Sequence, residues 1–280
     1  MLEDRRIAFV GPGVMAEAML TGLLSKAGVP PDHITVCGPR RERLEQLAQR
    51  HAVLITADSR QGAAGADILV ISVKPQSLDD VVAEVRGAIP MGSLVISIVA
   101  GARMADLTNG LDHDSVVRAM PNTPAQVGQG ITVWTATPAV TDDQRSETRQ
   151  VLGAFGDELF VDQEDYLDMA TALSGTGPAY VYLFMESMVD AGVHLGFPRR
   201  IAEQLVVQTV KGSVAYYEHS PRHLARLRNQ VTSPGGTSAA ALYYLEKAGF
   251  RTALSRAIWA AYERSVALGE GRKRGGIGEG

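Results

Sequence analysis

The first 160 or so residues alternate between short apolar runs and longer amphipathic stretches. The apolar runs are rich in Val and Ile and cover residues 7–10, 34–37, 53–55, 68–73, 94–99 and 116–119. Several are apolar without alternation, as expected for parallel strands that are covered on both faces. Helical patterns lie between them, over residues 15–26, 41–50 and 78–86. This rhythm predicts a doubly wound, Rossmann-type α/β fold with a parallel sheet.

The second half of the chain has a different pattern. Runs at 131–135 and 158–161 predict two added strands on either side of a helix over 142–155. After residue 162 the strand signals stop, and helical patterns follow at 166–173, 179–195, 199–218, 238–248 and 252–268. We therefore predict a Rossmann-type domain over residues 1–162 and an all-α domain over 163–280, with a disordered glycine-rich tail at 271–280.

Composition fits this division. The 280 residues are enough for two domains, and 45% hydrophobic with 21% charged residues is typical of a soluble globular protein. A net charge of −4 gives no indication of a nucleic-acid or membrane surface. The single cysteine, Cys37, excludes an intrachain disulfide, and no signal peptide or membrane span is recognisable. The expected location is the cytoplasm.

The predicted helical domain carries apolar and small residues around its helices, for example over 201–210. A small domain with that much apolar surface is expected to bury part of it against a partner chain. We predict at least a homodimer, with a ring of dimers as the larger alternative.

Residues 11–16 directly follow the first predicted strand and fit the dinucleotide-binding fingerprint G-x-G-x-x-G/A. Gly11 permits the tight turn, Gly13 lets the backbone approach a pyrophosphate, and Ala16 allows the helix to pack closely on the strand. The helix that follows offers unpaired N–H groups to the phosphates. The predicted cofactor contacts in this loop are Gly11, Gly13, Val14, Met15 and Ala16.

The end of the second predicted strand bears on the choice of cofactor. NAD-binding folds usually place an acidic residue there for the ribose 2′-hydroxyl. This chain has Gly38-Pro39-Arg40-Arg41 instead, and arginine suits the 2′-phosphate of NADP(H). We predict NADP(H), with NAD(H) as the alternative, and Arg40 as a contact. In the competing interpretation the two arginines merely begin a solvated helix.

Ligands of such folds bind at the carboxyl ends of the strands. Pro75 stops the fourth predicted strand and exposes the side chain of Lys74, although a plain strand terminator beside a surface lysine would give the same pattern. Small residues after the fifth strand would let a nicotinamide ring lie against the backbone. The predicted cofactor contacts at these strand ends are Ser59, Val73, Lys74, Pro75, Ile98, Val99 and Ala100.

Three further segments carry a family resemblance. They are Arg-Ala-Met-Pro-Asn-Thr-Pro-Ala at 118–125, Leu-Ser-Gly-Thr-Gly-Pro-Ala-Tyr at 173–180 and Val-Thr-Ser-Pro-Gly-Gly-Thr-Ser at 231–238. With the glycine loop and Val73-Lys74-Pro75, they stand in the same order as in the pyrroline-5-carboxylate reductases, which the chain resembles from about residue 6 to 268. The resemblance implies reduction of L-1-pyrroline-5-carboxylate to L-proline by NADPH, the last step of proline biosynthesis.

The resemblance also implies that the Ser-Pro-Gly-Gly loop holds the substrate carboxylate. The implied contacts are Glu164, Ser233, Gly235, Gly236, Thr237 and Ser238. The residue types agree, because the two glycines can bring N–H groups to an anion and the hydroxyls stand at a helix start. A plain glycine turn with a Ser/Thr cap is the alternative for the loop, and an ordinary surface acid is the alternative for Glu164.

The sequence departs from the family pattern at three positions. Ser238 replaces a usual Thr and Thr176 a usual Ser, so both hydroxyls are kept. Asn229 replaces a common acidic residue, which puts a charge at that position in doubt.

The implied reaction transfers hydride from C4 of the dihydronicotinamide to C5 of the ring C=N, whose nitrogen must gain a proton. Ser238 is the candidate catalytic residue, as hydrogen-bond donor or proton relay to that nitrogen. The alternative enzyme with the same two-domain plan is a 3-hydroxy-acid dehydrogenase. Such an enzyme would need a lysine or histidine in the helical half as its catalytic acid. Lys211 and Lys247 are the lysines there apart from Lys273 in the tail, and neither lies in a glycine-rich loop.

A non-enzymatic function and a metal site receive less support from the sequence. A non-enzymatic dinucleotide-sensing protein would need no anion-binding loop in its second half. His219 and His223 have the i,i+4 spacing of metal ligands, but Pro221 between them would disrupt the helix, so no metal site is predicted.

Overall fold

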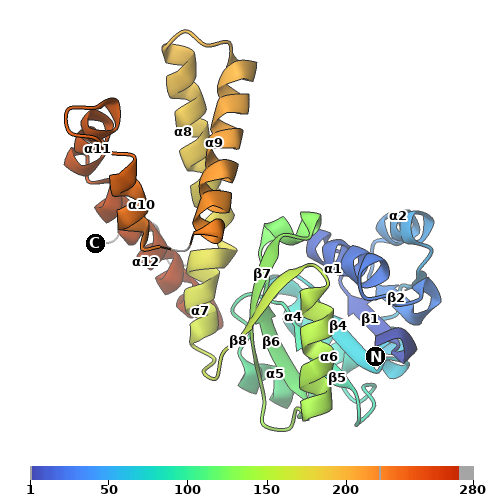
Figure 1. The fold of residues 1–280 in the computed structure, drawn as a ribbon. Coiled ribbons are helices and arrows are strands. Elements are labelled where there is room, and N and C mark those ends of the chain that lie inside the picture. The colour runs from blue at the N-terminus through green and yellow to red at the C-terminus, as the bar shows by residue number, and fades with distance from the viewer. Residues whose placement is uncertain (1, 221, 271–280) are drawn as a thin grey trace. The chain divides into compact units, whose positions relative to one another are not determined.

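The computed structural model describes residues 2–220 and 222–270, so the predicted disordered tail lies outside the described residues. These residues form two compact units (Figure 1). One contains residues 2–177 and 261–270, and the other contains residues 178–260. The predicted division at residue 162 falls just after the last strand, whereas the division by packing falls after Gly177.

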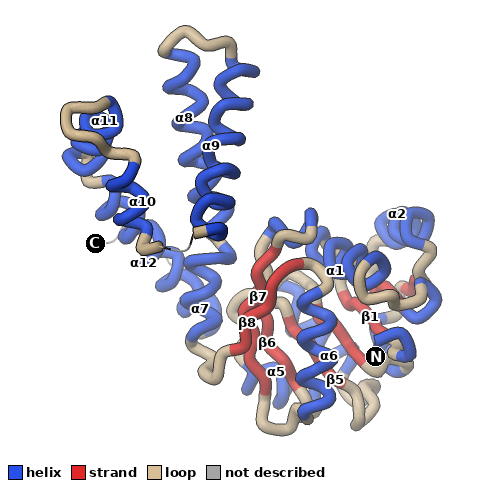
Figure 2. Tube along the Cα trace, in the orientation of Figure 1, coloured by secondary structure: helices blue, strands red, loops and turns tan. Residues whose placement is uncertain are grey.

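The first unit is built on one eight-stranded sheet (Figure 2). The strands are β1 (Ile7–Val10), β2 (Ile34–Cys37), β3 (Leu54–Thr56), β4 (Ile68–Ile71), β5 (Leu94–Ser97), β6 (Val116–Met120), β7 (Gly130–Ala136) and β8 (Gly156–Phe160). Their order in the sheet is β3-β2-β1-β4-β5-β6-β7-β8. The sheet therefore has the doubly wound order, and the predicted fold class is confirmed.

The last two strands reverse direction. β1 to β6 are parallel, β7 runs antiparallel to β6, and β8 runs parallel to β7. The connection from Met120 to Gly130 is shorter than the dozen or so residues that a parallel crossover needs, so β7 must pair in the opposite direction. The sheet is mostly parallel, not wholly so.

Helices cover both faces of the sheet. Those of the first unit are α1 (Val14–Ser25), α2 (Arg41–His51), α3 (Ser59–Ala64), α4 (Leu78–Val85), α5 (Met104–Leu111), α6 (Asp142–Gly153) and α7 (Tyr166–Ala170). Ile7 and Phe9 of β1 pack with buried residues of α1, α2 and α6, whereas Ala8 and Val10 pack with those of α3, α4 and α5. The central strands are apolar at every position because both of their faces are buried.

Two strands end earlier than the apolar runs predict. β4 ends at Ile71 and β5 at Ser97, rather than at residues 73 and 99. The apolar run outlasts β5 because Val99 is buried in the core although its backbone has left the strand. Two predicted strand ends are thus loop segments at the carboxyl edge of the sheet.

The sequence patterns missed three helices, α3, α5 and α10 (Leu224–Gln230), and extended a fourth too far. A single helix was predicted over 166–173, but α7 ends at Ala170 and a π-helical turn, η5 (Thr171–Gly175), follows. The backbone N–H of Thr176 donates to the carbonyl of Thr171 at 2.8 Å, which is the wider hydrogen-bond spacing of a π-turn.

The second unit contains no strand among its described residues. Its helices are α8 (Gly177–His194), α9 (Arg199–His219), α10, α11 (Thr237–Lys247) and the first part of α12 (Phe250–Gly269), whose end belongs to the first unit. The buried hydrophobic residues are Val189 of α8 with Ala202 and Val206 of α9. Nowhere in the described parts of the chain does a helix have the length and apolar character to cross a membrane.

Candidate active site

The loop between β1 and α1 has the backbone that its glycines predict. Gly11 has φ +106°, and a Cβ built on it would lie 2.7 Å from the carbonyl oxygen of Ser72, where no side chain fits. Gly13 is the N-cap of α1, so the first N–H groups of that helix have no capping side chain. Val14, the first residue of α1, is 60% exposed, and Ala16 is buried. The loop therefore offers free N–H groups at an open helix N-terminus, which fits a pyrophosphate.

Neighbouring segments hold this loop in place. The Ser72 hydroxyl, just after β4, donates to the carbonyls of Val10 and Gly11 at 3.1 and 2.9 Å. Gly38 follows β2, and a Cβ built on it would lie 2.5 Å from Cδ of Pro12. Sequence reasoning missed Ser72, since a serine at a strand end has no distinctive pattern. The loop lies between β1 and β4, where the strand order reverses and such folds bind nucleotides.

A cluster of charges joins α1 to α2 behind the loop. The Glu17 carboxylate accepts hydrogen bonds from Arg43 and Arg50 and contacts His51 at 3.3 Å. Burial alone would raise the pKa of Glu17, but hydrogen bonds from Arg43 and His51 and the positive charge of Arg43 outweigh it and lower the pKa to about 2. Arg43 also donates to the carbonyl of Pro12 at 3.1 Å, so this cluster buttresses the glycine loop.

The two arginines predicted to face a 2′-phosphate differ in their contacts. Arg41 pairs with Glu45 one turn along α2 at 2.8 Å. Arg40 is the exposed N-cap residue of α2, and its side chain makes no hydrogen bond or ion pair within the described residues. Arg40 is therefore the arginine available to an added anion.

Most of the other predicted cofactor contacts lie at two strand ends, after β4 and after β5. Val73 reaches the Gly11 loop, and Lys74 and Pro75 follow it on the exposed surface. The backbone of Ile98 still pairs with Ile71 at 3.0 Å, which places residues 98–100 beside the end of β4. Ser59 instead lies buried at the start of α3, and its backbone N–H donates to Glu84.

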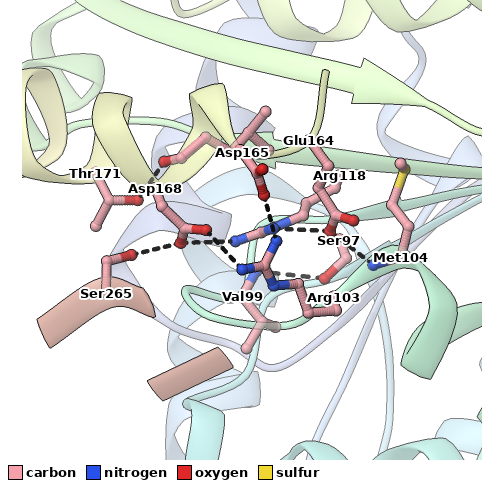
Figure 3. Close-up of polar contacts among 11 residues, drawn as sticks. Ser97, Val99, Arg103, Met104, Arg118, Glu164, Asp165, Asp168, Thr171 and Ser265 are labelled. Carbon is pink, nitrogen blue, oxygen red and sulfur yellow. Dashed lines mark hydrogen bonds and ion pairs between the residues drawn. The ribbon is translucent and has the colours of Figure 1, made fainter. Parts of the chain in front are cut away.

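A buried ionic cluster lies between β6, α5 and α7 (Figure 3). Arg118 of β6 is 2% exposed and donates to Glu164 at 2.7 Å and to Asp168 at 3.4 Å. Arg103 completes the cluster, since it donates to Asp165 at 2.9 Å and lies 3.3 Å from Oδ2 of Asp168. The hydrogen bond that Arg103 donates to Asp165, together with the charges of Asp168 and Glu164, raises the pKa of Arg103 despite its partial burial.

Glu164, predicted as a substrate contact, is occupied by two partners in this cluster. Its Oε1 accepts from Arg118 and, at 2.8 Å, from the backbone N–H of Met104 at the start of α5. A carboxylate at a helix N-terminus satisfies a free N–H and complements the helix dipole. Sequence reasoning missed Asp168 and Arg103. The available signal was Arg118, a charged residue in an otherwise apolar strand that requires buried partners.

The Met-Pro-Asn segment contacts the Ser-Gly-Thr-Gly segment. The Asn122 side chain donates to the carbonyl of Ser174 at 3.1 Å and accepts from the backbone of Ile131 at 3.0 Å. A Cβ built on Gly175 would lie 2.9 Å from the methyl carbon of Met120, so the two segments pack closely at this point. Two of the segments that carry the family resemblance thus pack together around the π-turn.

The Ser-Pro-Gly-Gly loop of the second unit forms a tight turn before α11. Gly235 has φ +70°, and the Gly236 N–H donates to the carbonyl of Ser233 at 3.1 Å. Gly236 is the N-cap of α11, followed by Thr237 and Ser238 as the first helical residues. The Ser238 hydroxyl has no hydrogen-bond partner among residues 2–220 and 222–270. The helix start therefore presents uncapped N–H groups and free hydroxyls to an anion.

The histidines do not form a metal site among the described residues. His219 ends α9, and His223 is the N-cap of α10, where its ring accepts from the Ala225 N–H at 3.2 Å. No group of three His, Cys, Asp or Glu side chains within residues 2–220 and 222–270 is placed to hold a metal ion.

Comparison with known proteins agrees with this geometry. Residues 164–268 match the family model described as pyrroline-5-carboxylate reductase dimerisation, and residues 6–101 match the model described as NADP oxidoreductase, coenzyme F420-dependent. A pyrroline-5-carboxylate reductase of Synechocystis is 40% identical over 95% of this chain and 98% of its own length.

Two solved structures are also similar over nearly their full length. The Plasmodium falciparum pyrroline carboxylate reductase with NADP bound is 32% identical, with a TM-score of 0.88 over 95% of this chain and 99% of that one. The Coxiella burnetii pyrroline-5-carboxylate reductase is 35% identical, with a TM-score of 0.87 over 94% and 98%. Because the Synechocystis, Plasmodium and Coxiella proteins are 32–40% identical to it over nearly their whole length, the chain belongs to the pyrroline-5-carboxylate reductase family.

Proposed function

We propose that this protein reduces L-1-pyrroline-5-carboxylate to L-proline with NADPH. The observation that carries the proposal is the start of α11, where a glycine N-cap leaves the helix N-terminus open beside the unpartnered hydroxyl of Ser238. A carboxylate-bearing cyclic imine matches this arrangement, because it needs both an anion site and a hydrogen-bond partner for its ring nitrogen. The relatives named above are pyrroline-5-carboxylate reductases, which supports the proposal.

NADPH, when bound, supplies the hydride. The chain's contribution would be to hold the dinucleotide: Gly11 and Gly13 would admit the pyrophosphate, and the N–H groups of Val14, Met15 and Ala16 would bind it. Arg40 would pair with the 2′-phosphate, and residues 98–100 would lie against the nicotinamide. Lys74 and Pro75 flank the same edge. The Plasmodium relative with NADP bound supports the choice of cofactor.

The second unit would hold the substrate. The N–H groups of Gly235 and Gly236, with the hydroxyls of Ser233 and Thr237, would anchor the carboxylate and so select the ring face that receives hydride. Ser238 would hydrogen-bond the ring nitrogen and favour its protonated, more electrophilic form. Glu164 is a weaker candidate for a substrate contact, since Arg118 and Met104 already occupy its carboxylate.

A 3-hydroxy-acid dehydrogenase remains the second candidate. It would need an acid such as Lys211 or Lys247, and these lysines lie exposed on α9 and at the end of α11. The Lys247 ammonium lies 5.8 Å from the ring centre of Tyr243, a contact that suits a surface lysine.

The dimerisation family match over residues 164–268 shows that the chain carries the segment with which this family assembles. We propose a homodimer formed through the second unit, and a ring of dimers as a larger assembly. A cytoplasmic location is proposed from the buried free thiol of Cys37, which suits a reducing compartment.

The test is substrate-dependent oxidation of NADPH by the full chain. L-1-pyrroline-5-carboxylate is compared with 1-pyrroline, which has the same ring without the carboxylate, and with 3-hydroxy acids offered with NADP⁺. Charge-assisted hydrogen bonds contribute about 1.5–3 kcal/mol each, so losing the carboxylate should lower kcat/KM by about 100-fold. Equal turnover of the two imines contradicts the anion site, and turnover of hydroxy acids alone favours the second candidate.

A further inference from the structure

The last turn of α12 contacts the loop that follows β5, within the first unit. Gly101 has φ +76°, and a Cβ built on it would lie 3.1 Å from Cβ of Leu268. In return, a Cβ built on Gly269 would lie 3.1 Å from the carbonyl oxygen of Gly101 and 3.2 Å from Nε of Arg103. Two glycines therefore let the end of α12 pack directly on loop 98–103, which the proposed cofactor site places against the nicotinamide.

Asp168 joins the two sides of this contact (Figure 3). Its carboxylate is 1% exposed, and its Oδ1 accepts from the buried hydroxyl of Ser265 on α12 at 2.7 Å. Its Oδ2 lies 3.3 Å from the guanidinium of Arg103, at the far end of loop 98–103. The same carboxylate thus holds the helix by a hydrogen bond and the loop by an ion pair.

Further contacts hold the Asp168 carboxylate and loop 98–103 in place. Arg118 of β6 lies 3.4 Å from Oδ1, which anchors the carboxylate to the sheet. Arg103 also donates a hydrogen bond to the exposed carboxylate of Asp165, at 2.9 Å. At the other end of the loop, the Ser97 hydroxyl accepts from the Val99 N–H at 3.3 Å. Loop 98–103 is therefore fixed at both ends and covered by α12.

A buried carboxylate with two guanidinium groups is a weak way to gain stability, because desolvation offsets most of the attraction. The arrangement is better suited to setting geometry, since its partners come from three separate segments: β6, the loop before α5, and α12. Hydride transfer depends on the position of the nicotinamide, so a loop that contacts the ring must be held rigidly.

We propose that Asp168 is a positioning residue for hydride transfer: through Ser265 and Arg103 it clamps loop 98–103 between the sheet and the last turn of α12. The inference rests on the proposed placement of the nicotinamide against residues 98–100. It assigns Asp168 and Ser265 a role in the reaction without contact with substrate or cofactor.

The test compares Ser265→Ala with Ser93→Ala, a matched control. Both serines are 3% exposed, and both donate a 2.7 Å hydrogen bond, but Ser93 bonds to Ala66 at the opposite, amino end of β5. Three quantities are measured on the full-length variants: backbone hydrogen exchange of residues 98–103, kcat with saturating substrates, and the Kd for NADPH. The melting temperature is recorded for each.

Losing one buried hydrogen bond corresponds to about a tenfold change in a local opening equilibrium. We expect Ser265→Ala to speed exchange of residues 98–103 about tenfold and to lower kcat about fivefold or more. Its NADPH Kd should change less than about threefold, because the phosphate contacts are intact. Ser93→Ala should change each of these quantities less than about twofold while melting earlier by a similar amount.

Two results overturn the proposal in different ways. Equal exchange of residues 98–103 in the two variants means that Asp168 and Ser265 do not clamp the loop. Faster exchange in Ser265→Ala with an unchanged kcat means that the clamp exists but the loop does not serve hydride transfer, which refutes the placement of the nicotinamide. In both cases the reductase activity of the wild-type chain would stand. Asp168→Asn, which removes the charge facing Arg103, should reproduce the Ser265→Ala pattern if the variant folds.

Discussion

The arginines at the start of α2 differ in what holds each side chain. Arg43 donates hydrogen bonds to Glu17 and to the Pro12 carbonyl, and Arg41 forms an ion pair with Glu45. The side chain of Arg40 has no such partner in the described chain. The sequence predicts Arg40 as the contact for a 2′-phosphate, but it does not show that Arg43 is engaged elsewhere. That contact depends on Glu17, which lies on a different helix.

Arg40→Ala should raise the KM for NADPH about tenfold or more and leave the KM for NADH nearly unchanged. The reason is that a charge-assisted hydrogen bond contributes about 1.5–3 kcal/mol and only NADPH carries the 2′-phosphate. Initial rates with both cofactors measure this. Arg41→Ala is the matched control and should have a smaller effect because Arg41 is engaged with Glu45. An equal rise for both cofactors would refute the assignment of Arg40.

The resemblance implies that Ser238 bonds the substrate nitrogen, and its place near a predicted helix start gives capping as the alternative. The N-cap of α11 is Gly236, and Ser238 lies inside the first turn with its hydroxyl unpaired in the described structure. This geometry favours the bond to the substrate nitrogen. A lost cap would lower stability by about 1 kcal/mol, whereas a lost substrate hydrogen bond lowers kcat in a protein that is still folded.

We expect Ser238→Ala to lower kcat about tenfold or more, equivalent to about 1.4 kcal/mol, with an unchanged melting temperature and NADPH affinity. Ser238→Thr keeps the hydroxyl and should remain active. Ser146→Ala, on the exposed side of α6, serves as the control for a serine without a role at the site. A Ser238→Ala enzyme that turns over normally but melts earlier would identify Ser238 as a capping residue only.

At the scale of elements, one carboxylate fastens α1 to α2. Glu17 has two arginines and a histidine around it, and its pKa is held at about 2 instead of the usual 4.5. A carboxyl with a lowered pKa in the folded state contributes stability that is present above its unfolded pKa. That stability is lost as the pH falls toward the folded value. For Glu17 this contribution is lost between about pH 4.5 and pH 2.

Glu17→Gln should therefore melt earlier at neutral pH and show a flatter decline of Tm between about pH 5 and pH 3 than the wild type. Thermal melts across that range measure it. Glu42→Gln is the control, because Glu42 is an exposed acid on α2 outside the cluster. If the two variants decline in parallel with the wild type, the Glu17 cluster does not contribute to acid stability.

Some elements were predictable because their cause is local, and others were not. β1 and β2 were placed at their observed bounds, since a run buried on both faces shows in the sequence itself. α3 was missed because Gly62 in its middle reads as a helix breaker. A Cβ on Gly62 would overlap the sulfur of Cys37, which is 25 positions earlier in the sequence. The Cys37 thiol is deeply buried there, and its burial raises its pKa to about 12. Only the fold reveals that glycine is needed there.

The candidate site also contains residues that the sequence could predict and residues that it could not. The glycine loops were found because each follows from a local backbone requirement, Gly11 by its positive φ and Gly236 by its place at a helix start. Asp168, Ser265 and Ser72 were missed because their roles consist of contacts between distant segments. The Asp168–Ser265 bond, for example, joins residues 97 positions apart.

At the scale of the whole molecule, the two units differ in how much core they contain. The sheet unit has large clusters of buried side chains on both faces, whereas the described residues of the helical unit bury three hydrophobic side chains. Its helices expose Leu183, Phe184 and other large apolar residues, and a groove of about 590 Å³ lies among α10, α11 and α12. Such a unit depends on a partner surface for its stability.

The wild-type chain should be a dimer or larger at micromolar concentration by light scattering. The double variant with Leu183→Glu and Phe184→Glu should shift the chain toward the monomer and lose most of its activity. The reason is that burying a charge in an apolar interface is costly. Leu159→Glu on β8 is the control, an exposed leucine of the sheet unit. A wild-type monomer at that concentration would contradict assembly through the helical unit.

The end of α12 has a consequence for how the chain is made. Asp168 lies buried beside two arginines, and its hydrogen-bond donor Ser265 is synthesised 97 residues later, after the entire helical unit. Domains generally fold in order as they leave the ribosome. The sheet unit departs from that order in one respect, because the buried carboxylate of Asp168 lacks its hydrogen-bond donor until the helical unit has emerged. Translation arrested before Ser265 should therefore leave this N-terminal unit sensitive to protease, and release of the full chain should protect it.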